Sequence, residues 1–99
     1  MDTTENKEGE GELEKFPVRD PDALTKTLRP LKLRERLATL RSMYNLSQGE
    51  ASDAIRRKRN AWSNWEAEED NPRRTVPGPR SRAALAYVFS LPQSLFVDD

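Results

Sequence analysis

The sequence predicts a compact all-α domain of four to five helices, preceded by a disordered acidic tail. Two segments, 33–44 and 84–89, repeat apolar residues at the three- and four-residue spacing of a helix face. Between them, Ser47 and Glu50 have the spacing of a capping box, which marks the start of another helix. No segment is predicted to be a strand.

Residues 1–30 are expected to form the disordered tail and its lead-in, and residues 31–97 the folded domain. The first 30 residues hold eight acids and five bases, and up to about Asp20 they show no apolar periodicity. Such a segment buries too little apolar surface to offset the entropy that ordering costs. Residues 22–28 have the composition of one loose helical turn, which Pro30 ends.

The first helices of the domain are defined by their apolar spacing and by their ends. The stripe in 33–44 predicts one helix, and Asn45 suits the left-handed residue that ends it. The next helix is expected from Ser47 to Ile55, with small residues that let another helix approach closely. A third helix should follow over 59–66.

The C-terminal part of the domain is expected to begin with a loop over residues 72–80, which is rich in proline and arginine. Ser81 is the expected cap of the last helix. After Pro92, a final turn is expected to fold Leu95 and Phe96 back onto the core.

The charged residues are distributed unevenly, although the net charge is zero. Residues 31–82 hold twelve bases and seven acids, so the middle of the chain is basic while its two ends are acidic. A basic surface on a small domain points to an anionic partner such as nucleic acid.

Residues that the chain lacks disfavour several classes of function. It has no cysteine and no histidine, which removes thiolate sites, the commonest general base and the commonest metal ligand. We therefore expect no enzyme, no metal site and no cofactor. No apolar run approaches the ~18 residues of a membrane-spanning helix. With no secretion signal in the sequence either, we expect a cytoplasmic protein that does not bind membranes.

The segment from Leu46 to Glu66 reads Leu-Ser-Gln, small residues, Ile, a basic turn and Trp-x-x-Trp-Glu. With the preceding helix, it resembles the lambda-repressor-like (XRE-type) helix-turn-helix family over residues 33–72. The resemblance continues less closely through 82–89 and 95–96, which look like the family's fifth helix and closing turn. It implies a transcription regulator that reads the major groove of double-stranded DNA with the helix around 59–66.

The side chains expected to contact DNA come from both motif helices and from the loop after them. Arginine suits bidentate contact with guanine and asparagine suits adenine. The resemblance implies base contacts at Arg59, Asn60 and Asn64, and a phosphate contact at Gln48. The full set of expected DNA-binding residues is Gln48, Arg57, Lys58, Arg59, Asn60, Ser63, Asn64, Arg73 and Arg74.

Three of these interpretations have a structural alternative. Trp62 and Trp65 suit either the core or a stacking platform for single-stranded nucleic acid, and their helical spacing favours the core. Arg41 and Glu66 suit either solvated surface charges or, as the resemblance implies, a partly buried ion pair. Gln48 suits a phosphate contact and a capping role equally.

The turn between the two motif helices departs from the resembled family. Arg56 and Arg57 replace its usual glycine and apolar residue, so we expect a distorted turn or a longer preceding helix. Lys58 stands where the family has a Ser or Thr cap. The acidic run 68–70 disfavours phosphate contacts, which Arg73, Arg74, Arg80 and Arg82 are expected to take over. For Arg57 and Lys58, phosphate contacts are expected, with a solvated turn as the alternative.

Double-stranded DNA is the expected partner, bound by a twofold homodimer as is usual in the resembled family. Apolar residues at Tyr87, Leu91 and Leu95 suit either that dimer contact or the core of one chain. The acidic tail, residues 1–20, is expected to compete with DNA. The alternative function is a protein-interaction adaptor or antitoxin-like module whose tail binds a partner protein. The C-terminal segment also resembles mycobacterial nucleoid-associated regulators of the family, which implies a nucleoid-associated location.

Overall fold

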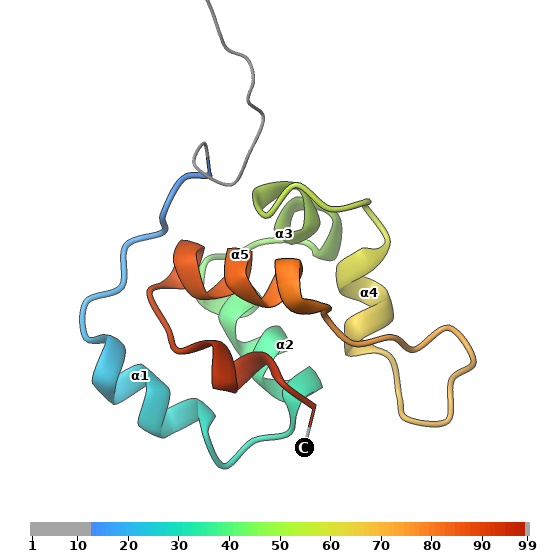
Figure 1. Ribbon diagram of the computed structural model, residues 1–99, viewed down its shortest axis with the longest axis horizontal. Coiled ribbons are helices and arrows are strands. Elements are labelled where there is room, and N and C mark those ends of the chain that lie inside the picture. The colour runs from blue at the N-terminus through green and yellow to red at the C-terminus, as the bar shows by residue number, and fades with distance from the viewer. Residues whose placement is uncertain (1–12, 99) are drawn as a thin grey trace, which may run out of the picture.

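The computed structural model describes residues 13–98, which form five α-helices, one short 3-10 helix and no strand (Figure 1). The all-α class is therefore confirmed. In chain order the elements are α1 (Pro21–Leu28), α2 (Leu33–Met43), α3 (Gln48–Ala54), α4 (Ala61–Glu66), α5 (Pro79–Phe89) and η2 (Gln93–Phe96).

The starts and ends of α2 and α3 follow from local hydrogen bonds that the sequence predicts. The Ser47 hydroxyl accepts from the Glu50 amide at 3.0 Å, and the Ser47 amide donates to the Glu50 carboxylate at 2.8 Å, which confirms the capping box. Asn45 has a φ of 59° and ends α2 as expected. Its amide donates to the carbonyl of Ser42, and the Leu46 amide donates to that of Arg41, the two bonds of a Schellman motif.

Two helices begin at other residues than the sequence predicts. α4 starts at Ala61, two residues later than expected, because residues 58–61 first form a turn in which the Ala61 amide donates to the carbonyl of Lys58. α5 starts at Pro79 with Gly78 as its cap, so Ser81 lies inside the helix and is buried. Proline suits a first helical turn, since its missing amide hydrogen would have no intrahelical acceptor there.

The segment just before α1 belongs to the folded unit, contrary to the expectation of disorder up to about Asp20. Leu13 is buried, and the Phe16 amide donates to the carbonyl of Val88 at 2.9 Å. The Phe16 ring lies 5.0 Å from that of Tyr44 and 5.3 Å from that of Phe89. The few apolar residues of this segment are irregularly spaced, so the sequence shows no periodic pattern that would predict its packing against the core. The rest of the predicted tail, residues 1–12, lies outside the described residues.

A buried arginine joins α1, α2 and η2. Arg36 is 2% exposed, and its guanidinium donates to the carbonyls of Leu28, Arg29 and Leu95 at 3.0, 2.7 and 2.9 Å. These acceptors supply the hydrogen bonds that a buried cation requires. Leu28, which ends α1, is fully buried. The 21–28 segment is therefore a docked helix and not the loose turn that we expected.

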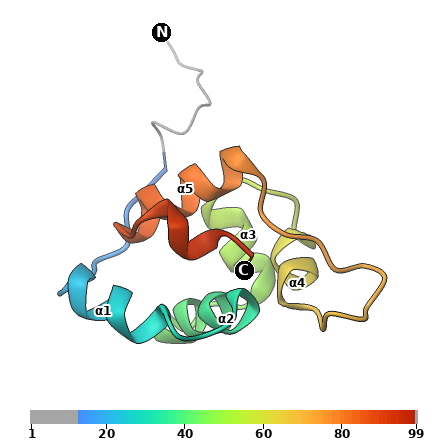
Figure 2. The ribbon, with the colours of Figure 1, turned by 60° about the horizontal axis from the view of Figure 1, so that its bottom comes forward.

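The core lies between α5 and the α1–α2 pair, with α3 and α4 closing one end (Figures 1 and 2). Leu91, Leu95 and Phe96 are buried in it, which confirms that the closing turn folds back. Tyr87 remains 41% exposed, with the Lys15 ammonium 4.7 Å from its ring centre. Leu91 and Leu95 thus close the core of one chain and are not available for a dimer contact. None of the helices described here has the length and hydropathy needed to cross a membrane.

Candidate nucleic-acid interface

Ser52 fixes the close approach of α3 and α4. It is fully buried, and its hydroxyl accepts from the Trp62 amide at 2.9 Å. The start of α4 is thereby tied to the middle of α3, and Ile55 is buried beneath the connection. The sequence does not predict this role of Ser52, which is one of several small residues in the segment.

The turn after α3 keeps the geometry of a regular helix end despite its unusual residues. Arg56 itself adopts the left-handed conformation, with a φ of 59°. The Arg56 amide donates to the carbonyl of Asp53 at 3.0 Å and the Arg57 amide to that of Ser52 at 2.9 Å, which again makes a Schellman motif. The expected distortion and the longer helix are therefore both wrong. The backbone hydrogen bonds hold Arg56 in a conformation that costs about 1–2 kcal/mol for a residue with a Cβ.

Four consecutive cations on this turn are exposed, and together they are called the basic turn: Arg56, Arg57, Lys58 and Arg59. In a Schellman motif the residue after the left-handed position usually packs an apolar side chain against the helix. Here that residue is Arg57, whose side chain is exposed. Asn60, which is also exposed, leads directly into α4. The turn thus presents positive charge beside the first residues of α4.

Arg59 lies back against α3. Its guanidinium donates to the Asp53 carboxylate at 3.1 Å, and both side chains are more than half exposed. It also lies close to Gly49, where an added Cβ would collide with it. Because Gly49 has no side chain, the guanidinium can lie flat over the first turn of α3. An exposed pair of this kind contributes about 0–1 kcal/mol, so a stronger anionic partner can take Arg59 from Asp53.

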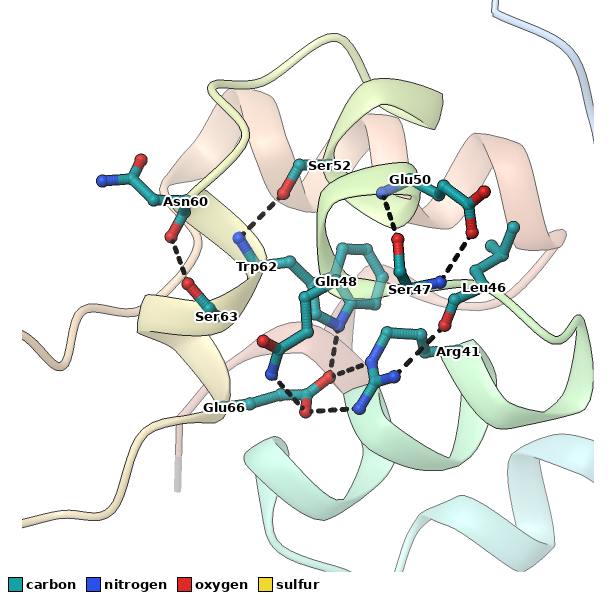
Figure 3. Close-up of polar contacts among 10 residues, drawn as sticks. All are labelled: Arg41, Leu46, Ser47, Gln48, Glu50, Ser52, Asn60, Trp62, Ser63 and Glu66. Atoms are coloured by element: carbon teal, nitrogen blue, oxygen red, sulfur yellow. Dashed lines mark hydrogen bonds and ion pairs between the residues drawn. The ribbon is translucent and has the colours of Figure 1, made fainter.

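The outer side of α4 carries short polar groups, and its inner side carries both tryptophans. Trp62 is fully buried and Trp65 is 4% exposed, which confirms the core interpretation and leaves neither ring available for stacking. Ser63 and Asn64 are half-buried on the outer side. The Ser63 hydroxyl donates to the carbonyl of Asn60 at 3.0 Å (Figure 3).

A single carboxylate connects α2, α3 and α4 (Figure 3). Glu66 accepts from the Arg41 Nε at 2.7 Å and Nη2 at 2.9 Å, from Gln48 Nε2 at 3.0 Å and from Trp62 Nε1 at 2.6 Å. The remaining Arg41 Nη1 donates to the carbonyl of Leu46. These hydrogen bonds to Glu66 hold the pKa of Arg41 above its ordinary value. The partly buried ion pair of Arg41 and Glu66 is confirmed. Through Gln48, helix α3 is also hydrogen-bonded to the Glu66 carboxylate.

The two loop arginines lie on a segment whose backbone contacts α4, since the Thr75 amide donates to the carbonyl of Asn64 at 3.2 Å. Arg73 is exposed on the segment between α4 and α5, and its amide donates to the Asn71 side chain. Arg74 is only 17% exposed in its side chain and donates to the Asp98 carboxylate at 3.2 Å. Neither the loop composition nor the sequence spacing indicated this contact with the C-terminal segment. Arg74 in this arrangement is paired within the chain.

The candidate interface therefore consists of the basic turn, Asn60 and the outer side of α4, supported by Gln48 through Glu66. These residues are neighbours in the chain, which is why the sequence could bring most of them together. No protein-family model matches the chain, and no curated protein or solved structure matches it significantly.

Proposed function

We propose that the chain is a sequence-specific, double-stranded DNA-binding transcription regulator. In this proposal α3 and α4 form a lambda-repressor-like helix-turn-helix, and α4 enters the major groove. The observation that carries it is the exposed basic turn, which leads directly into a helix with polar groups outside and both tryptophans in the core. A DNA-reading helix needs this combination of a fixed inner side, an adaptable outer side and nearby positive charge.

The basic turn would supply the phosphate contacts. Arg57 and Lys58 are exposed, so their charge is available to the DNA backbone. Phosphate neutralisation of this kind provides most of the non-specific affinity of such proteins and makes it depend on salt. Gln48 would act indirectly, because its amide is hydrogen-bonded to Glu66 and holds α3 in place beside α4.

Base reading would come from Arg59, Asn60 and Asn64, with Ser63 beside them. Arginine can bind the O6 and N7 atoms of guanine, and asparagine can bind the N6 and N7 atoms of adenine. Arg59 would first have to leave Asp53, which an exposed ion pair permits at low cost. We further propose a twofold dimer on DNA and a cytoplasmic, nucleoid-associated location, as the resembled family implies.

The second candidate function is a protein-interaction adaptor or antitoxin-like module. It is favoured by the acidic residues Glu68, Glu69 and Asp70, which are exposed directly after α4. These carboxylates would repel phosphates and suit a basic partner protein. Glu68 lies near a cation, with 3.6 Å between its Oε1 and Arg34 Nη2.

Fluorescence anisotropy with a pool of genomic duplexes, titrated over salt concentration, tests the proposal. The full chain should bind a selectable subset of duplexes, and log Kobs should fall with log salt by about 0.9 for each phosphate contacted. The double variant Arg59→Ala/Asn64→Ala should lose the selectivity. Arg19→Ala, which removes an exposed arginine outside the interface, is the control. Absence of binding at low salt would reject the proposal and favour the adaptor.

A further inference from the structure

A hollow of about 190 Å³ lies where the start of α2, the α4–α5 connection and the C-terminal segment meet. Its charged lining residues are Arg29, Lys32, Arg34 and Arg74, with Glu69 and Asp98. None of them belongs to the basic turn. Figure 1 shows the start of α2 and the segment that follows η2 together, well apart from the turn that leads into α4. The hollow is therefore a second basic feature, distinct from the proposed DNA interface.

Two arginines in this lining have hydrogen-bonding capacity that the chain does not use. The Nε atoms of Arg34 and Arg74 are shielded from solvent, and neither has a hydrogen-bond partner among the described residues. A shielded donor without an acceptor is unfavourable, and more so when it carries charge. Native structures rarely leave such groups unsatisfied, so two in one hollow point to an acceptor that comes from outside the chain.

The carboxylates that do approach these arginines are weakly held. Glu68 lies 3.6 Å from Arg34 Nη2, which is longer than a hydrogen bond, and its side chain is 75% exposed. Asp98 lies 3.2 Å from Arg74 Nη2, and its side chain is 41% exposed. In each pair the carboxylate partner is exposed to solvent, which weakens its attraction to the arginine. Both carboxylates can therefore move aside, which frees the Nη2 atoms of the two guanidinium groups for another acceptor.

We propose that this hollow binds the phosphate group of a small ligand, with Arg34 and Arg74 as its principal donors. A phosphate group carries close to two negative charges and three acceptor oxygens, so it can serve two guanidinium groups at once, whereas a planar carboxylate matches one. Arg29 and Lys32 add positive charge at the rim. Water occupies about 30 Å³ per molecule in the liquid, so the hollow has room for a phosphate group and part of what carries it.

The test is a titration of the full chain with inorganic phosphate at constant ionic strength, followed through the Nε–Hε NMR signals of arginine. The signals of Arg34 and Arg74 should shift together and saturate. Arg74→Gln and Arg34→Gln should each weaken binding by about tenfold, since each removes a charge-assisted hydrogen bond. Asp98→Asn should tighten it several-fold, because it removes the resident competitor. Arg19→Gln is the charge-matched control and should change nothing.

Three results would overturn the proposal. One is a shift that grows linearly without saturation. Another is Asp98→Asn binding phosphate no better than the unaltered chain, which would show that Asp98 does not occupy the site. The third is a response of the Arg34 and Arg74 signals to duplex DNA but not to inorganic phosphate, which would assign the hollow to the DNA backbone. Duplex binding that fails while phosphate binds would reject the proposed DNA function and leave this site standing.

Discussion

Arg41 of α2 binds both oxygens of the Glu66 carboxylate at the end of α4, with distances of 2.7 and 2.9 Å from its Nε and Nη2 atoms. The two residues are 25 positions apart, and their bidentate pairing sets the angle at which α4 leaves the α2–α3 pair. Gln48 and Trp62 donate to the same carboxylate. The orientation of the proposed reading helix therefore depends on one acidic side chain.

Removal of the Glu66 carboxylate should destabilise the fold strongly. We expect Glu66→Ala to lower the free energy of unfolding by about 3 kcal/mol, because it leaves Arg41 partly buried and unpaired and deprives Trp62 and Gln48 of their acceptor. Urea unfolding followed by tryptophan fluorescence measures this. Glu68→Ala removes an exposed acid and should change stability by less than about 0.5 kcal/mol. Equal effects of the two substitutions would contradict the role assigned to Glu66.

Arg56 should be replaceable by a residue better suited to a positive φ. Arg56→Gly is expected to stabilise the chain by roughly 1 kcal/mol, since glycine carries no Cβ in the left-handed conformation at the end of α3. The matched control is Arg57→Gly, which removes the same charge at a position without a positive φ and should be neutral or destabilising. Thermal unfolding of both variants at equal salt decides the matter. A lower melting temperature for Arg56→Gly would show that the turn does not carry this strain.

Glu50 should titrate below the ordinary glutamate range. Its pKa is lowered chiefly by the backbone hydrogen bond from Ser47, then by the Ser47 side chain. A lowered folded-state pKa means that the contribution of Glu50 to stability is present above its unfolded pKa and is lost as the pH falls through the folded value. Ser47→Ala keeps the backbone donor and removes only the side chain, so it should move the Glu50 pKa part of the way upward and cost about 1 kcal/mol of capping. A carboxyl NMR titration of both chains checks the shift, and an unchanged Glu50 pKa in Ser47→Ala would contradict the contribution of the Ser47 side chain.

Deletion of residues 1–12 should tighten DNA binding at low salt. This segment holds five acids and one base, and it joins the fold at Leu13, which lines a hollow shared with Arg56 of the basic turn. Its negative charge would compete with phosphates there, by an amount that falls as salt screens it. The comparison is anisotropy of the full and shortened chains at low and high salt, with a chain whose five acids are changed to glutamine as a control. Equal DNA affinity of the full chain, the shortened chain and the glutamine variant at low salt would show that the acids of residues 1–12 do not compete with DNA.

That deletion must stop at residue 12, because the structure places 13–20 in the fold. Phe16 packs on Tyr44 and Phe89, and the Tyr44 hydroxyl donates to the carbonyl of Pro17 at 2.6 Å. Removing residues 1–20, as the sequence alone would suggest, would also remove these contacts. A weaker affinity of that longer deletion would then report lost stability instead of lost competition.

The features that the sequence by itself determined are those set by residues close together in the chain. The Ser47–Glu50 capping box and the left-handed Asn45 use hydrogen bonds that span three to five residues, so spacing alone reveals them. The inward side of α4 follows in the same way, because Trp62 and Trp65 lie three apart on one helix face. Most of the candidate interface is predictable for this reason, since it is one short, continuous segment. The ion pair of Arg41 and Glu66 needed the family resemblance as well.

The tertiary structure alone decided where the distant charges and the chain ends lie. Nothing in the sequence around Arg36 distinguishes it from an exposed arginine. It is buried because the carbonyls of Leu28, Arg29 and Leu95 converge on its guanidinium. Arg74, which is expected to contact DNA, pairs with Asp98, 24 residues away. Such contacts depend on which surfaces the packed helices bring together. That is a property of the whole core, and no local periodicity or spacing encodes it.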